Sequence, residues 1–219
     1  MSVLKKRWLE VRTNRDLRCD VGLNMILNLI PRALSYWHFV SSAALSFPMV
    51  SEGTVQLRQK HNSRIIIAGV DVAQRLSGIS LKLLAFQKLL HDYPIYIDKV
   101  CLVQKCLLPG SRSADEEATM KEIRALVQGI KSQYGPDVID CEEIRGNSLP
   151  IVQRLSLWKA SSVLMVTPIR EGFNFIPMEY VYTKKAPAPP GVVISSEFSV
   201  VCSVLNGALR VNPYDVQVR

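Results

Sequence analysis

The sequence predicts an α/β protein built on a parallel sheet with helices on both faces. Three observations lead to this prediction. From residue 64 onward, short apolar runs rich in β-branched residues alternate with stretches of helical periodicity. Pro and Gly residues separate the two kinds of segment. A length of 219 residues with 48% hydrophobic content allows a sizeable buried core. Such alternation is typical of β-α-β units.

The first unit begins with a β-branched run, residues 64–70, which predicts a buried strand. A helix is expected over residues 79–91, because Ile79, Leu83, Phe86 and Leu90 share one face and Pro94 follows. The next strand is expected at residues 99–103.

A second helix is expected to begin at Ser113, because Ser113 and Glu116 have the spacing of a capping box. Apolar residues continue on one helical face as far as Tyr134, and the Gly135-Pro136 pair ends the pattern. The remaining strands are expected at residues 138–141, 162–167, 192–195 and 208–211. The remaining helices are expected at residues 149–160, 176–183 and, as a short helix, 199–205.

The charge is unevenly distributed along the chain. The net charge is +8, and residues 1–65 hold 10 basic and 4 acidic residues against 17 and 15 in the remainder. We therefore expect residues 1–52 to be a basic and apolar extension of irregular or partly helical structure, and residues 53–219 to be the folded domain. Residues 33–50 lack Asp, Glu, Lys and Arg, but four serines and Pro48 predict no membrane span there.

Metal and disulfide sites are not expected. The five cysteines and three histidines are scattered and form neither a C-x-x-C nor an H-x-x-x-H pair. Buried free thiols in a reducing, cytoplasmic setting are the simplest interpretation.

Three loops are expected at one edge of the sheet. In doubly wound sheets, ligands bind where strands end and helices begin, which are residues 71–78, 107–115 and 168–174 here. Helix N-termini at these loops offer free N–H groups to a phosphate. None of the loops is a G-x-G-x-x-G or G-x-x-x-x-G-K-[ST] fingerprint.

The same loops resemble those of the trehalose-phosphate synthase family. The segments that carry the resemblance are Gly69-Val70-Asp71 followed by Gly78-Ile79, Val100-Cys101-Leu102-Val103-Gln104, Ser111-Arg112, Val166-Thr167-Pro168-Ile169-Arg170-Glu171-Gly172-Phe173-Asn174, Glu179-Tyr180, Ser196-Glu197-Phe198 and Gly207-Ala208-Leu209-Arg210-Val211-Asn212-Pro213-Tyr214-Asp215. They run in the family's order, which makes the set specific. Residues 78–85 are especially similar to the plant-type branch of the family.

The resemblance implies one Rossmann-like half of a retaining GT-B glycosyltransferase, the C-terminal half that binds the donor. The family transfers glucose from UDP-glucose to glucose 6-phosphate, so UDP-glucose is a substrate and no cofactor or metal is implied. The implied donor-binding residues are Glu171, Gly172, Phe173, Asn174, Phe175 and Glu179. Glu171 would contact the glucose hydroxyls, Glu179 the ribose hydroxyls, and Arg112 the acceptor phosphate. The implied partners are a nucleotide sugar, a sugar phosphate, and an N-terminal GT-B domain or a synthase homologue.

The first phosphate loop departs from the family pattern. The family has an Arg and a Lys that neutralise the UDP diphosphate, where this chain has Val72 and Ser77. Removing two cations weakens the stabilisation of a leaving diphosphate.

Three functions therefore stay open: a glucosyltransferase domain that is inactive without its other half, a non-catalytic sugar-phosphate-sensing relative, and a basic module for nucleic acid or membranes. The third has the weakest basis, because no aromatic residues are interleaved with the basic ones, and we expect no nucleic-acid or membrane partner.

Overall fold

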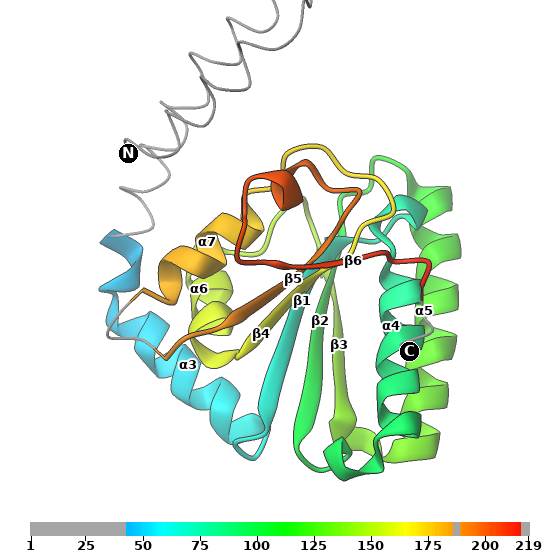
Figure 1. Cartoon of the computed structure of the whole chain (residues 1–219), viewed down its shortest axis with the longest axis horizontal. Coiled ribbons are helices and arrows are strands. Elements are labelled where there is room, and N and C mark those ends of the chain that lie inside the picture. Colours follow the sequence, from blue (N-terminus) through cyan, green and yellow to red (C-terminus); the bar gives the residue numbers. More distant parts are fainter. Residues whose placement is uncertain (1–42, 186–188, 216–219) are drawn as a thin grey trace, which may run out of the picture. The chain divides into compact units, whose positions relative to one another are not determined.

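The computed structural model describes residues 43–185 and 189–215. Six strands form one sheet in the order β3-β2-β1-β4-β5-β6, and every neighbouring pair is parallel (Figure 1). The parallel sheet expected from the sequence is confirmed. The expected extension, residues 1–52, lies outside the described residues as far as residue 42.

The strands are β1 Ile65–Val72, β2 Val100–Leu108, β3 Ile139–Arg145, β4 Val163–Val166, β5 Val192–Ser196 and β6 Leu209–Val211. The α-helices are α3 Pro48–Lys60, α4 Ile79–Asp92, α5 Ser113–Tyr134, α6 Ile151–Ala160 and α7 Ile176–Thr183. A short 3-10 helix, η4 Val200–Ser203, lies within the short helix expected at residues 199–205.

Strands β2 and β3 both extend beyond the expected residues. The apolar run stops at Gln104 and Lys105 in β2 and at Glu142 in β3, whereas the backbone pairing continues through them to Leu108 and Arg145. The charges are accommodated because Lys105 of β2 forms an ion pair with Glu142, its register partner on β3. Cross-strand pairing of opposite charges thus lengthens the sheet past the apolar run.

Two apolar clusters lie on the two faces of the sheet. One includes Leu83, Phe86 and Leu90 of α4, with Met120, Ile123 and Ile130 of α5. The other includes Leu155, Leu157 and Trp158 of α6, with Val50 of α3 and Tyr180 of α7. Helices therefore cover both faces (Figure 1), as the sequence predicts.

Helix α3 is an element that the sequence analysis did not identify. It spans the position at which we expected the domain to begin, and Val50 and Thr54 are its buried residues. Its contact with α6 is close and partly polar, because the Ser156 hydroxyl donates to the Val50 carbonyl at 3.1 Å. A Cβ at Gly53 would lie 2.6 Å from that hydroxyl oxygen. The small polar residues at this contact explain why α3 lacks a strong apolar pattern.

The capping-box prediction at α5 is half right. Ser113 is the first helical residue, and the N-cap position belongs to Arg112, whose side chain makes no capping bond. Glu116 nevertheless accepts hydrogen bonds from the backbone N–H groups of Gly110, at 3.0 and 3.1 Å, and of Arg112, at 3.3 Å. The glutamate thus bonds back to the N–H of the N-cap residue, as in a capping box, and also to Gly110 in the preceding loop.

The order in which strands are added to the sheet reverses between β1 and β4. From β1 the chain proceeds through β2 to β3 at one edge, and β4 then starts on the other side of β1 and leads to β5 and β6. This is the topological switch point at which doubly wound sheets bind ligands. None of the helices within residues 43–185 and 189–215 has the length and apolarity that crossing a membrane requires.

Candidate functional site

The loops that follow β1, β2 and β4 start at the same edge of the sheet, as expected for parallel strands. Backbone contacts join the first and the third of these loops. The Ile169 N–H donates to the Leu76 carbonyl at 2.9 Å. Gly78 has φ 68°, and a Cβ at this position would lie 2.4 Å from the Thr167 carbonyl oxygen. The two loops pack this closely because residue 78 has no side chain.

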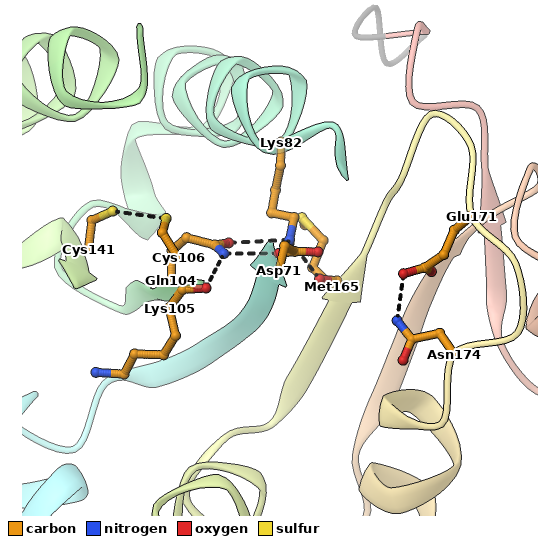
Figure 2. A network of polar contacts seen from close by, with 9 residues as sticks. All are labelled: Asp71, Lys82, Gln104, Lys105, Cys106, Cys141, Met165, Glu171 and Asn174. Atoms are coloured by element: carbon orange, nitrogen blue, oxygen red, sulfur yellow. Dashed lines mark hydrogen bonds and ion pairs between the residues drawn. The ribbon is translucent and has the colours of Figure 1, made fainter. Parts of the chain in front are cut away.

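A buried polar network lies just below these loops (Figure 2). The Lys82 ammonium of α4 contacts Asp71 Oδ2 at 2.5 Å, Gln104 Oε1 at 3.2 Å and the Met165 carbonyl at 3.0 Å. Gln104 Nε2 also donates to Asp71 Oδ2 at 2.9 Å. The Lys82 side chain has no exposed surface. One ammonium thus ties together β1, β2 and β4.

Gly69 makes room for this network. A Cβ at residue 69 would lie 2.3 Å from Gln104 Oε1 and 2.9 Å from Lys82 Nζ. Lys82 lies in the amphipathic helix expected at residues 79–91, but its buried role was not predicted from the sequence. Two features of the sequence could have indicated this network: a lysine next to Leu83 on the inward face of the helix, and a glutamine inside an apolar strand.

The loop after β4 holds the acidic candidate Glu171. Asn174 Nδ2 donates to Glu171 Oε1 at 3.0 Å, and Asn174 Oδ1 accepts the Ile176 N–H at 2.9 Å (Figure 2). Asn174 therefore orients the glutamate and also caps the start of α7. Glu171 Oε2 is buried and lacks a hydrogen-bond partner among the described residues. Burial raises the pKa of Glu171, and the nearby Asp71 carboxylate raises it further.

The other loop candidates surround this pair. Gly172 is exposed, whereas Phe173 and Phe175 are half-buried, and their rings meet edge to face at 4.9 Å. The structure thus places Glu171, Gly172, Phe173, Asn174 and Phe175 together at the N-terminus of α7. The first turn of α7 itself offers few donors, because the Ile176 N–H is bonded to Asn174 and Pro177 has no N–H.

Glu179, on the first turn of α7, is engaged in contacts within the protein. Arg154 of α6 donates from Nε to Oε2 at 2.5 Å and from Nη2 to Oε1 at 3.0 Å. The Trp158 indole N–H donates to Oε2 at 2.9 Å. The sequence analysis did not single out Arg154, and no local pattern connects it to Glu179.

Arg112 lies apart from this group, on the loop after β2. With Val72, Gln74, Pro109, Ser111, Glu116 and Asn147 it lines a cavity of about 310 Å³. The cavity is formed by the ends of β1, β2 and β3, and Val72 contributes an apolar surface to it. Ser77 is buried, and Arg75 between these positions is exposed.

Within the part of the chain that the structure describes, no cluster of three or more His, Cys, Asp or Glu residues could hold a metal ion. Cys101, Cys106 and Cys202 are buried free thiols, and Cys141 is half-buried.

Comparison with known proteins identifies the family. The model of Glycosyltransferase family 20 matches residues 30–218. The chain belongs to glycosyltransferase family 20. A relative from Yarrowia lipolytica, an alpha,alpha-trehalose-phosphate synthase [UDP-forming], is 30% identical over 214 residues, which cover 96% of this chain and 44% of the relative.

Solved structures of family-20 proteins share the fold. An Escherichia coli structure bound with UDP-2-fluoro glucose superimposes with a TM-score of 0.70 at 25% identity, covering 81% of this chain and 39% of that one. An alpha,alpha-trehalose-phosphate synthase (UDP-forming) from Burkholderia xenovorans, in complex with glucose-6-phosphate, has a TM-score of 0.68 at 25% identity, covering 77% and 38%. This chain therefore spans less than half the length of these relatives.

Proposed function

We propose that this chain is the donor-binding half of a trehalose-phosphate-synthase-type glucosyltransferase. Its loops would bind UDP-glucose, and a second half, supplied by an N-terminal GT-B domain or a synthase homologue, would complete the acceptor site. The observation that carries the proposal is the Glu171–Asn174 pair. It lies beside the switch point of the sheet, and one buried carboxylate oxygen has no partner among the described residues.

The chemistry of the loop suits a sugar diphosphate. A carboxylate that keeps a free oxygen accepts hydrogen bonds from sugar hydroxyls. The loop before α7 would offer the backbone N–H groups of residues 172–175 to the diphosphate. These donors are held in place before the ligand arrives, because Asn174 bonds both Glu171 and the Ile176 N–H. A preorganised donor stabilises negative charge without further rearrangement.

Arg112 is proposed to bind the phosphate of the acceptor. It lines the cavity of about 310 Å³ at the ends of β1, β2 and β3, a volume that suits a small ligand. A guanidinium binds phosphate through two parallel hydrogen bonds. The similarity of residues 78–85 to the plant-type branch leads us to propose membership of that branch as well.

A second function is favoured by Val72 and Ser77. An apolar Val72 lines the cavity and Ser77 is buried, so neither side chain neutralises a diphosphate. Without these two cations the departure of UDP would be slow. The chain would then bind sugar phosphates as a non-catalytic regulatory relative of the family.

Calorimetry with UDP-glucose tests the binding proposal. Weak binding, with a dissociation constant of about a millimolar or somewhat below, is expected. Absence of heat at millimolar UDP-glucose and UDP would refute a donor site.

A glucosyl-transfer assay with radiolabelled UDP-glucose and glucose 6-phosphate separates the two functions. No turnover by this chain alone and recovery of turnover with an added N-terminal half would support the enzyme. Binding without turnover in either case would support the non-catalytic relative.

A further inference from the structure

The Arg154–Glu179 pair takes up the carboxylate that the donor site would offer to a nucleoside. The guanidinium reaches both oxygens of Glu179, and the Trp158 indole occupies a further position on Oε2. Arg154 Nη1 also donates to the Leu149 carbonyl at 2.9 Å, which fixes the guanidinium to the loop after β3. The arginine is thus held by two partners, Glu179 and the Leu149 carbonyl.

The two partners differ in exposure. The Glu179 side chain is 2% exposed and the Arg154 side chain 20%. The guanidinium is therefore the partner that solvent reaches, and a ligand must displace it to contact the carboxylate. A bidentate charge-assisted pair of this kind is one of the stronger hydrogen-bonded contacts in proteins.

Ribose recognition in doubly wound folds commonly uses a carboxylate that accepts hydrogen bonds from ribose hydroxyls. The hydroxyls are neutral donors, and they would have to replace a cationic fork that already satisfies both oxygens. Glu171 presents the opposite situation, since its Oε2 has no partner within the described residues. Glu171, which suits a hexose, therefore has a free carboxylate oxygen, whereas both oxygens of Glu179, which suits a nucleoside, are bonded to Arg154.

We propose that Arg154 sets the ligand class of this site by withholding Glu179 from ribose. The inference rests on the proposed donor site. The site then recognises the hexose and phosphate parts of a ligand, and a nucleoside adds little to the binding. The chain would accept hexose phosphates and pyrophosphate about as well as the corresponding nucleotides.

The test compares UDP with inorganic pyrophosphate by calorimetry, in the wild type and in Arg154→Lys. Lysine keeps the positive charge but lacks the fork, so one Glu179 oxygen becomes available. In the wild type, the dissociation constants of UDP and pyrophosphate should agree within about threefold. In Arg154→Lys the affinity for UDP alone should rise by about tenfold, which is the worth of one added hydrogen bond. Arg124→Lys is the matched control, because Arg124 forms the same forked pair with Glu143 on the exposed surface. Arg124→Lys should leave the ratio of the UDP and pyrophosphate dissociation constants unchanged.

Trp158 gives a readout that survives even if the variant fails to fold. Its indole N–H donates to Glu179, so its NMR signal reports any ligand that reaches this carboxylate. In the wild type, saturation with UDP should leave the signal where pyrophosphate leaves it. A UDP-specific shift, or a wild-type preference for UDP of tenfold or more, would overturn the inference.

The inference and the proposed function fail in different ways. The proposed donor site and the role of Arg154 are both refuted if neither the wild type nor Arg154→Lys binds UDP, UDP-glucose or pyrophosphate. An unchanged ratio in Arg154→Lys, with clear binding of both ligands, overturns the role of Arg154 alone.

Discussion

The ammonium of Lys82 lies 2.5 Å from Asp71 Oδ2, in the interior between α4 and the sheet. The contact links the first turn of α4 to the end of β1. It lies directly beneath the loops of the candidate site.

Lys82→Met should lower the free energy of unfolding by about 3–5 kcal/mol, because the buried Asp71 carboxylate loses its charged partner. Urea unfolding followed by circular dichroism measures the change. The double variant Asp71→Asn/Lys82→Met should recover a large part of it. Lys88→Met is the control, since the Lys88–Asp92 pair is partly exposed and is worth less than about 1 kcal/mol. Equal losses for Lys82 and Lys88 would contradict the role of the network.

Gly78→Ala should destabilise the fold by about 1–3 kcal/mol, because residue 78 has a positive φ and its Cβ would meet the Thr167 carbonyl. Thermal unfolding in a calorimeter reports the change. Gly129 provides the matched substitution: it lies in α5 with open space around it, so Gly129→Ala should stabilise the helix by about 1 kcal/mol. The changes in stability caused by Gly78→Ala and Gly129→Ala should therefore have opposite signs, and changes of the same sign would contradict the prediction.

Acid should destabilise the protein through His61. Burial lowers the pKa of His61 below its ordinary value of 6.5, so the unfolded chain binds this proton more readily than the folded one. The free energy of unfolding should therefore fall as the pH decreases from about 7.5 to about 5.5. Unfolding titrations across this range should show a smaller decrease for His61→Gln. Parallel curves for the two proteins would exclude His61 as the source.

Arg112→Leu should weaken binding of glucose 6-phosphate by about tenfold to a hundredfold, the worth of charge-assisted hydrogen bonds to phosphate. Its stability should change little, because the residue is exposed. Calorimetric titration measures the affinity, and Arg210→Leu, an exposed arginine on β6, serves as the control. Equal affinities for the wild type and Arg112→Leu would show that the phosphate binds elsewhere.

Val72→Arg should raise the affinity for pyrophosphate and UDP by about tenfold, because it places a cation on the cavity that Arg112 also lines. The added charge should also make binding weaken more steeply with salt. Val72→Met keeps the site uncharged and should not strengthen binding. The measurement is a calorimetric series at several salt concentrations. An equal gain for Met would assign the effect to packing.

Much of the architecture followed from local patterns. The β-branched runs predicted the strands, and the Pro and Gly residues that follow the helices predicted where several helices end, as at Tyr134. The strand order places three loops at one edge, and the resemblance of these loops to a known family led to Glu171 and Asn174. The hydrogen bond between these two residues spans only three positions.

Other features depend on contacts between distant segments. Lys82 meets a glutamine 22 positions away and a carbonyl 83 positions away, and no periodicity shows that the ammonium points inward. The Arg154–Glu179 pair spans 25 residues and exists because α6 and α7 pack on the same face. Helix α3 has no broad apolar stripe to predict it, because its buried residues are only Val50 and Thr54, which both bond to Ser156 of α6.

The Lys82 ammonium has three hydrogens, and the protein supplies three acceptors for them: Asp71, Gln104 and Met165. This lysine can stabilise the scaffold but has no hydrogen left to offer a substrate. Recognition of ligands is therefore left to residues at the rim, such as those at positions 72 and 112, which can change without disturbing the scaffold. A protein built this way can lose or regain an activity through a few surface substitutions while its fold stays the same.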